Sequence, residues 1–358
     1  MKLNIPKHYL PLYLALLFSL VLFACGQSLP GDTPAPSVSA TLASLPSPTP
    51  TLPPTATQLP SLLVLLAPPE ADPLIAGELQ PALAGLAAQV GLRFQARPSV
   101  AAVEFEQIKV LVALPPNPGL AELVAAAPQT QFLAIGFSGL EAANNLSVVG
   151  VLEERPDRLA FLAGYTAAVA TADWRVAVIS EAETVPGQVA RQAFTNGVTF
   201  YCGLCRPPYP PFPAGGYPLS VELAPAASPA DWQAALTYLS SWQVGAVYVQ
   251  PSLADQRFLD ALAQAGFNFI LSGPAPAGLQ GSWVASLGYK DPLQDALGLL
   301  PDLIAGRGGQ RVDLPLGFSQ VNPELLSPGR QHLAEGILAD LLAGYIGTGV
   351  DPLTGENP

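Results

Sequence analysis

Continuous apolar runs alternate with segments of helical spacing through residues 61–342, and this alternation constrains the fold more than any other feature of the sequence. Ser61–Leu66 lies between Pro60 and Pro68, and Ile108–Leu114 is stopped by two prolines. Such bounded runs are typical of strands that are buried on both faces. Strands that alternate with helices form right-handed units whose strands are parallel. The sequence therefore predicts an α/β fold.

The alternation runs twice, with a switch near residues 172–175. Apolar runs predict strands at 61–66, 92–96, 108–114, 132–135 and 148–151, and then at 176–179, 219–223, 244–249, 267–271, 283–287 and 314–318. Helical spacing predicts helices at 74–90, 119–127, 158–171, 187–196, 230–241, 253–265, 292–304 and 323–342. Gly91 and Gly197 fit the ends of two of these helices. We expect two lobes, each a parallel sheet flanked by helices, with a ligand cleft between them at the carboxyl ends of the strands.

The helix at 158–171 carries small residues on much of its surface, including Ala163, Gly164 and Ala167. A neighbouring element can therefore approach it closely, and we interpret it as the passage from one lobe to the other. We assign residues 61–172 and parts of 306–358 to the N-terminal lobe, and residues 173–305 to the C-terminal lobe. A chain of 358 residues that is 50% hydrophobic is large enough for both.

The N-terminus has the pattern of an export signal. Two lysines precede an uncharged apolar run that ends Leu22-Phe-Ala-Cys25-Gly. We predict a lipoprotein signal peptide at 1–24, lipidation of Cys25 and an anchor on the extracytoplasmic face of the cell membrane. An ordinary signal peptide with a chance cysteine is the alternative. Residues 25–60 are rich in Pro, Thr and Ser, which predicts an extended tether.

The charge and the cysteines exclude several classes of function. The formal net charge is −12 and no basic stripe exists, so we expect no nucleic-acid partner. Cys202 and Cys205 lie in a proline-rich insert at 201–217, and we predict that they form a disulfide; a redox pair is the alternative. We expect no metal, no cofactor and no enzymatic activity, since the sequence has no metal-spaced His/Cys set, no G-x-S-x-G and no P-loop.

Two stretches on either side of a predicted strand match a known family. Phe161-Leu-Ala-Gly-Tyr-Thr-Ala-Ala and Gln192-Ala-Phe-Thr-Asn-Gly197 resemble the basic membrane protein family, the PnrA-like substrate-binding lipoproteins of ABC importers. The resemblance extends over roughly residues 61–352. It implies a type I periplasmic binding protein fold that closes by hinge bending around a small molecule. It also implies an ABC permease as partner and a purine nucleoside as ligand.

The acids with which that family binds its ligand are largely replaced in this chain. The place of the family's D-x-S-F-N motif holds Ala67–Pro73, and Gly136-Phe137 and Ser272-Gly273 stand where two further aspartates are usual. Lys290 is the counterpart of a family lysine after a one-residue shift. The resemblance therefore predicts the fold and the class of protein, and it leaves the ligand open.

Topology alone places candidate ligand-binding residues at the ends of the strands. They are Glu70, Asp72, Asn117, Phe137, Ser138, Glu181, Gln250, Ser272, Tyr289 and Lys290. We predict a monomeric solute-binding lipoprotein that delivers a small molecule, a nucleoside among the candidates, to an ABC importer. The alternative is a binding-fold module that senses or adheres at the cell surface and has no transport role.

Overall fold

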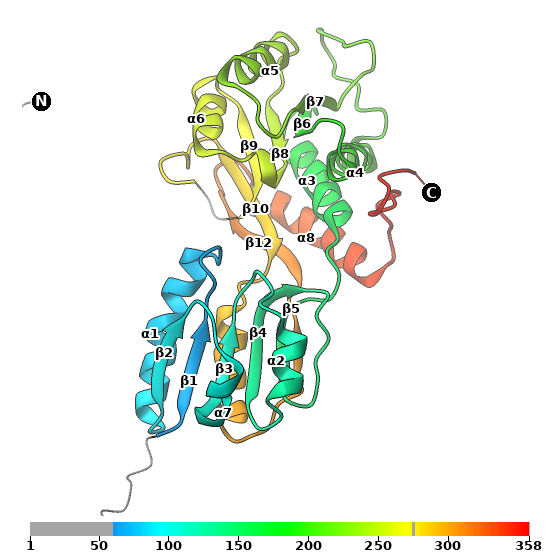
Figure 1. Ribbon diagram of the computed structural model, residues 1–358. Coiled ribbons are helices and arrows are strands. Elements are labelled where there is room, and N and C mark those ends of the chain that lie inside the picture. Colours follow the sequence, from blue (N-terminus) through cyan, green and yellow to red (C-terminus); the bar gives the residue numbers. More distant parts are fainter. Residues whose placement is uncertain (1–59, 274–275, 358) are drawn as a thin grey trace, which may run out of the picture. The chain divides into compact units, whose positions relative to one another are not determined.

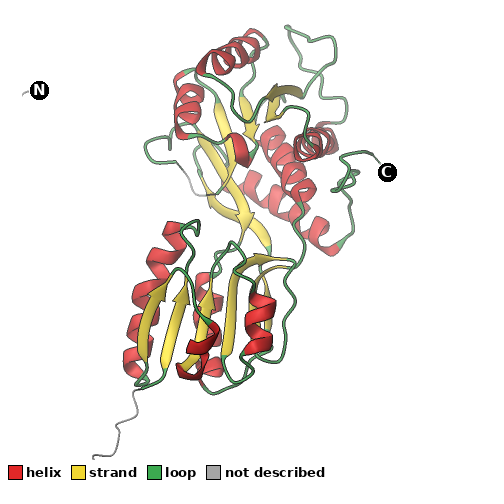
Figure 2. Ribbon diagram, in the orientation of Figure 1, coloured by secondary structure: helices red, strands yellow, loops and turns green. Residues whose placement is uncertain are grey.

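The computed structural model describes residues 60–273 and 276–357, which belong to one compact unit. This unit contains two six-stranded sheets flanked by helices (Figure 1, Figure 2). The predicted α/β fold with two sheets is therefore confirmed. The predicted signal peptide, Cys25 and the tether up to residue 59 lie outside the described residues. None of the described helices combines the length and the apolar character that a membrane crossing needs.

The first sheet is parallel throughout and has the strand order β11-β5-β4-β3-β1-β2. Its strands are β1 (Leu62–Leu66), β2 (Arg93–Arg97), β3 (Ile108–Ala113), β4 (Gln131–Ser138), β5 (Leu146–Val151) and β11 (Arg311–Asp313). One face is covered by α1 (Pro73–Gln89) and α7 (Leu293–Ile304), and the other by η1 (Ala102–Gln107) and α2 (Leu120–Ala126). Leu63 and Leu65 point to the first face and Leu62 and Val64 to the second, which explains the continuous apolar run.

The second sheet has the order β12-β10-β9-β8-β6-β7, and only the edge strand β12 is antiparallel. Its strands are β6 (Val176–Glu181), β7 (Leu219–Leu223), β8 (Ala246–Val249), β9 (Asn268–Ser272), β10 (Trp283–Tyr289) and β12 (Leu316–Val321). One face is covered by α3 (Pro156–Ala170), α4 (Val185–Cys202) and α8 (Pro328–Ala343), and the other by α5 (Pro229–Ser241) and α6 (Gln256–Gln264). A short helix, η2 (Pro251–Leu253), follows β8.

The chain passes between the two sheets three times within the described residues. The passages are 152–155 between β5 and α3, 290–292 between β10 and α7, and 314–315 between β11 and β12. We expected one strand at 314–318, but the chain leaves the first sheet at Asp313 and enters the second at Leu316. Pro315 lies between them and has no N–H to donate to a strand ladder.

The two cores divide the chain differently from the expected lobes. Helix α3 was expected in the N-terminal lobe, yet its Phe161 and Ala168 are buried together with Val178 and Ile270 of the second sheet. Helix α7 was expected in the C-terminal lobe, yet its Leu300 is buried against the first sheet. The packing assigns 61–151 and 293–313 to the first lobe, and 156–289 and 316–357 to the second.

Helices α3 and α4 cross at two glycines that face each other's backbone. A Cβ on Gly164 would overlap the carbonyl oxygen of Phe194, and a Cβ on Gly197 would overlap that of Phe161. Gly197 therefore lies inside a helix, which continues to Cys202, and it does not end the helix as we expected. The two stretches that carry the family resemblance are the two sides of this crossing.

We predict that Gly164→Ala and Gly197→Ala each lower the free energy of unfolding by about 1–3 kcal/mol, because the added methyl group forces the helices apart. Urea denaturation followed by circular dichroism measures the change.

Gly298→Ala is the matched control for these two substitutions. Gly298 is an exposed glycine of α7 with nothing within 4 Å of an added Cβ. This substitution should raise stability by about 0.5–1 kcal/mol, since alanine favours the helix. Equal effects at all three glycines would contradict the close crossing.

Candidate functional site

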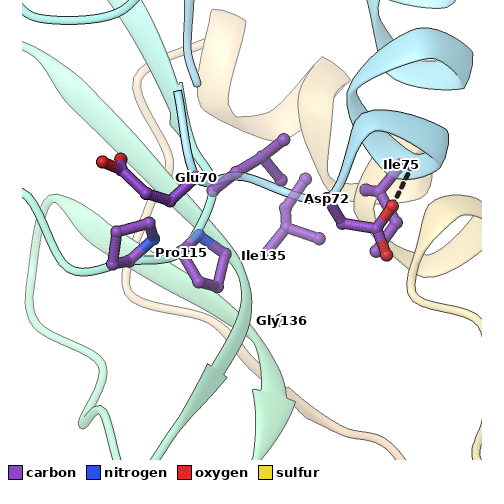
Figure 3. Close-up of a pocket in the computed structure, with 8 residues that line it drawn as sticks. Glu70, Asp72, Ile75, Pro115, Ile135 and Gly136 are labelled. Atoms are coloured by element: carbon purple, nitrogen blue, oxygen red, sulfur yellow. Dashed lines mark hydrogen bonds between the residues drawn. The ribbon is translucent and has the colours of Figure 1, made fainter. Parts of the chain in front are cut away.

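A cavity lies at the carboxyl edge of the first sheet, at its topological switch point. Strand β1 pairs with β2 on one side and with β3 on the other, so the connections leave β1 and β3 in opposite directions. Ligands of open parallel sheets bind at such a point. The cavity measures about 450 Å³, which suits a small molecule. It is lined by Glu70, Asp72, Ile75, Leu114, Pro115, Pro116, Ile135 and Gly136 (Figure 3).

Two carboxylates are the charged groups of this cavity. Glu70 is exposed in the loop after β1 and makes no hydrogen bond or ion pair among the described residues. Asp72 caps α1: its Oδ1 accepts the N–H of Leu74 at 2.8 Å and that of Ile75 at 3.4 Å. One carboxylate oxygen of Asp72 is thus used by the helix, and the other has no partner in the part of the chain that the structure describes. The remaining lining side chains are aliphatic or proline, so the cavity offers acceptors on an apolar wall.

The other predicted residues of the first lobe do not line this cavity. Asn117 accepts the N–H groups of Gly119 and Leu120 at 3.0 and 2.9 Å, which fixes the start of α2. Phe137 is only 6% exposed and belongs to the core beneath α2, so it offers no aromatic face to a ligand. Ser138 ends β4 and is exposed.

Three predicted residues lie at the corresponding edge of the second sheet. Glu181 ends β6 and Gln250 follows β8, on either side of that sheet's switch point. Gln250 is 7% exposed, and its Oε1 accepts the N–H of Glu181 at 2.9 Å. Ser272 ends the neighbouring strand β9 and is half-buried. At least one side-chain acceptor at this edge, Gln250 Oε1, is therefore occupied by a hydrogen bond within the fold.

Tyr289 and Lys290 lie where the chain leaves the second sheet. The hydroxyl oxygen of Tyr289 accepts the N–H of Arg155 at 3.0 Å, which joins the first passage to the end of β10, directly before the second passage. Lys290 is 52% exposed and pairs with Asp295 at 2.9 Å. Such an exposed pair at a helix start stabilises little.

A buried carboxylate holds the first passage to the C-terminal segment. Asp157 is fully buried and accepts two hydrogen bonds from the Arg155 guanidinium, at 2.9 and 2.8 Å. It also accepts the hydroxyl of Thr348 at 2.7 Å. Burial by itself raises the pKa of Asp157, but the bonds from Arg155, from Thr348 and from the Arg158 N–H outweigh it and hold the pKa below its usual range.

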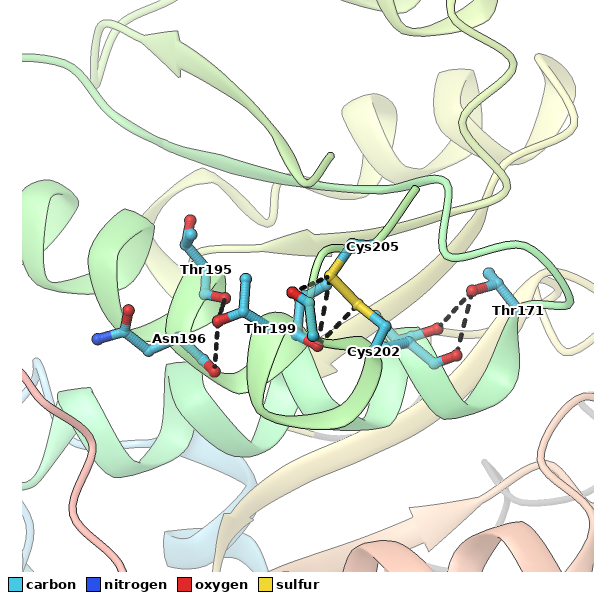
Figure 4. The surroundings of a disulfide bond; sticks show 10 residues. Thr171, Thr195, Asn196, Thr199, Cys202 and Cys205 are labelled. Atoms are coloured by element: carbon cyan, nitrogen blue, oxygen red, sulfur yellow. Dashed lines mark hydrogen bonds between the residues drawn. A yellow bond between two sulfur atoms is a disulfide. The ribbon is translucent and has the colours of Figure 1, made fainter. Parts of the chain in front are cut away.

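Cys202 and Cys205 form a disulfide at the C-terminal end of α4, with a Cα–Cα distance of 4.9 Å (Figure 4). The insert that follows is tied to the second sheet by the buried guanidinium of Arg175, which donates to the carbonyls of Tyr209 and Pro210 at 2.6 and 3.3 Å. Tyr209 itself is 74% exposed. The disulfide and the arginine therefore give the insert two fixed points.

Several lining residues of the first-lobe cavity were missed by the strand-end argument. Pro115 and Pro116 follow β3, but we used them only as a strand stop. Ile75 lies in the first turn of α1, and Gly136 has a φ of 76° near the end of β4. The signal was present, since each lies near a strand end or a helix start at the switch point, but the predicted residues were polar or aromatic, and these lining residues are aliphatic, proline or glycine.

Comparisons with known proteins find similar solved structures, but they assign the chain to no sequence family. The sequence matches no family model and no curated protein. A solute-binding protein of an ABC transporter system from Aeropyrum pernix K1 is 16% identical, with 83% of this chain and 84% of that chain covered and a TM-score of 0.45. An Agrobacterium radiobacter carbohydrate transporter solute-binding protein in complex with D-arabinose is 13% identical, with 76% and 98% covered and a TM-score of 0.42.

A putative repressor of the LacI family from Corynebacterium glutamicum is 12% identical, with 73% and 98% covered and a TM-score of 0.42. Binding proteins and regulators are thus about equally similar, and TM-scores below 0.5 carry no argument about function. Among the described residues, no group of three or more His, Cys, Asp or Glu side chains is placed to hold a metal ion.

We predict that Asp157→Asn lowers the free energy of unfolding at neutral pH by about 2 kcal/mol, because the Arg155 guanidinium loses its charged partner. The folded-state pKa of Asp157 is lowered, so its contribution is fully present above the ordinary carboxyl pKa of about 4 and is lost as the pH falls through the folded value. Urea denaturation should therefore show a difference between variant and wild type that narrows below about pH 4.

Glu335→Gln is the control for losing a carboxylate charge that is exposed and not buried. Glu335 is exposed on α8, where it accepts a hydrogen bond from Gln331 at 2.7 Å. Its loss should change stability by less than about 0.5 kcal/mol at either pH. A difference for Asp157→Asn that stays constant with pH would contradict the role of the buried charge.

Proposed function

We propose that this chain is an extracytoplasmic solute-binding lipoprotein that binds a small molecule in the first-lobe cavity and delivers it to an ABC permease. The observation that carries the proposal is the position of the cavity, at the switch point of a six-stranded parallel sheet. The exposed carboxylates and the apolar wall can bind a ligand that has both hydrogen-bond donors and an apolar surface.

The three passages support a function that depends on closure. Each lobe has its own core on both faces of its sheet, so each is able to move as a unit. The first passage is hydrogen-bonded through the Arg155 N–H to Tyr289, the last residue of β10 before the second passage. Closure over the first-lobe cavity would remove the ligand from water and strengthen its polar contacts.

The side chains that line the first-lobe cavity limit the classes of ligand that it can bind. Carboxylates accept from sugar or ribose hydroxyls and from amines, and nucleosides therefore remain among the candidates. The residues that line the first-lobe cavity include no aromatic ring on which a base would stack. Amines and polyols consequently belong in the first screen beside the nucleosides.

A thermal-shift screen of the full folded part, residues 58–358, tests the proposal. A ligand at a hundredfold excess over its Kd should stabilise the protein by about 2.7 kcal/mol. Ile75→Trp should abolish the shift, because the larger indole occupies part of the cavity and obstructs the ligand. Asp72→Asn should weaken binding by roughly tenfold, since it removes a charged acceptor but keeps the helix cap.

Asp255→Asn is the matched control, because Asp255 caps α6 through the N–H of Arg257 at 2.9 Å in the way that Asp72 caps α1. It should leave ligand binding unchanged. Failure of nucleosides, sugars, amino acids and amines to shift the melting temperature would overturn the proposal and leave a surface-interaction module as the better account.

A second prediction tests the anchor. Cys25→Ser should move the exported protein from the membrane fraction to the soluble fraction, because two acyl chains hold a protein on a membrane and none remains after the substitution. Fractionation after labelling with a radioactive or clickable fatty acid measures both lipidation and release. Cys202→Ser, which leaves the lipobox intact, is the control and should stay membrane-bound and labelled.

A further inference from the structure

A second cavity, of about 250 Å³, lies at the passages between the lobes and is separate from the first-lobe cavity. Residues of all three passages line it or directly adjoin it. Its lining consists of Val151, Leu152, Glu153, Arg155, Arg158, Tyr289, Asp313, Leu314, Pro315, Leu316 and Leu342. More than half of these residues are aliphatic or proline, so the cavity has an apolar body with charged groups at its margin.

Of the four charged residues that line this passage cavity, two have ion pairs and two, Glu153 and Arg158, have none among the described residues. Arg155 is held by Asp157, and Asp313 is held by Arg311 at 2.6 Å. Glu153 is exposed, and its negative charge helps to raise the pKa of the Arg155 guanidinium. The guanidinium of Arg158 is half-buried and makes neither an ion pair nor a hydrogen bond among the described residues. A positive group that has no ion pair among the described residues therefore lines a mainly apolar space, whose margin also carries the Glu153 carboxylate.

Tyr289 adds a second donor beside this guanidinium. Its hydroxyl oxygen accepts the Arg155 N–H, and its proton has no acceptor among the described residues. Burial raises the pKa of Tyr289 and the Arg155 N–H lowers it; the Glu154 and Asp157 carboxylates raise it and Arg158 lowers it, so charges of both signs act on the hydroxyl. A guanidinium and a phenol that both donate are a suitable pair for a carboxylate.

We infer that the passage cavity binds a small organic anion, with its carboxylate on Arg158 and the Tyr289 hydroxyl and its apolar part against Leu314, Leu316 and Leu342. The size sets an upper limit, because about 250 Å³ lies below the volume of pockets for drug-sized ligands. A carboxylate on an aromatic or short aliphatic body fits this limit.

An anion in this position would act on the movement of the lobes. The cavity is lined by residues of the first and third passages and by Tyr289, which directly precedes the second, and closure changes the backbone angles of passage residues. If the cavity exists in only one conformation of the passages, a bound anion stabilises that conformation. The site would regulate binding in the first-lobe cavity without sharing a residue with it.

Benzoate titrated into the folded part of the chain tests this inference, with benzyl alcohol as the uncharged ligand of the same shape. Calorimetry and thermal shift should show benzoate binding to the wild type at about 20 mM or below. Arg158→Gln should weaken that binding at least about tenfold, and Tyr289→Phe by a smaller factor. Arg158→Lys keeps the charge and should give an intermediate affinity.

Arg257→Gln is the matched control, since Arg257 is 78% exposed on α6 and remote in sequence from every passage. It should bind benzoate as the wild type does. Ile75→Trp should also leave benzoate binding unchanged, so a failure of the proposed ligand site and a failure of the anion site are distinguishable. No benzoate binding to the wild type, equal binding of benzyl alcohol, or unchanged affinity in Arg158→Gln and Arg158→Lys would each overturn the inference.

Discussion

The second lobe depends on the backbone contact between α3 and α4, where Gly164 meets the carbonyl of Phe194 and Gly197 meets that of Phe161. Side chains of any size at either glycine would separate the helices, and the buried faces of both would lose their contacts. Val169, Val189 and the other apolar residues of these helices fill the core against β6 and β8. Because α3 follows the first passage directly, this contact also fixes where the chain enters the second lobe.

The first passage is also fixed by a buried charge, the Asp157 carboxylate. Asp157 opens α3 and binds both Arg155 and Thr348, so the first passage and the C-terminal segment are held at one point. A buried carboxylate that lacked these donors would be costly, and the network explains why it is tolerated. Tyr289 extends the network to the second passage. The proposed anion site lies beside these residues, where a ligand could act on all three passages.

The two sheets repeat one topology and use it differently. Each has its switch point between two strands whose connections diverge, and parallel sheets bind ligands there. In the first sheet the switch point is open, and Glu70 and Asp72 border a cavity. In the second sheet Gln250 is buried and bonded to the backbone of Glu181. This difference makes the first lobe the better candidate for the ligand.

The sequence by itself determined the α/β class, most strands and helices and the edge at which polar residues gather, because apolar periodicity and strand ends are local features. It did not determine which lobe owns α3 and α7, since a small-residue or apolar helix face fits either sheet and only packing decides. It placed Gly197 at a helix end, whereas the contact with Phe161 keeps that glycine inside α4. It proposed Phe137 for a ligand, whereas the irregularity of β4 at Gly136 puts that ring in the core on the face of Phe132 and Ala134. The cavity at the passages joins residues far apart in the chain, and only the tertiary structure could bring them together.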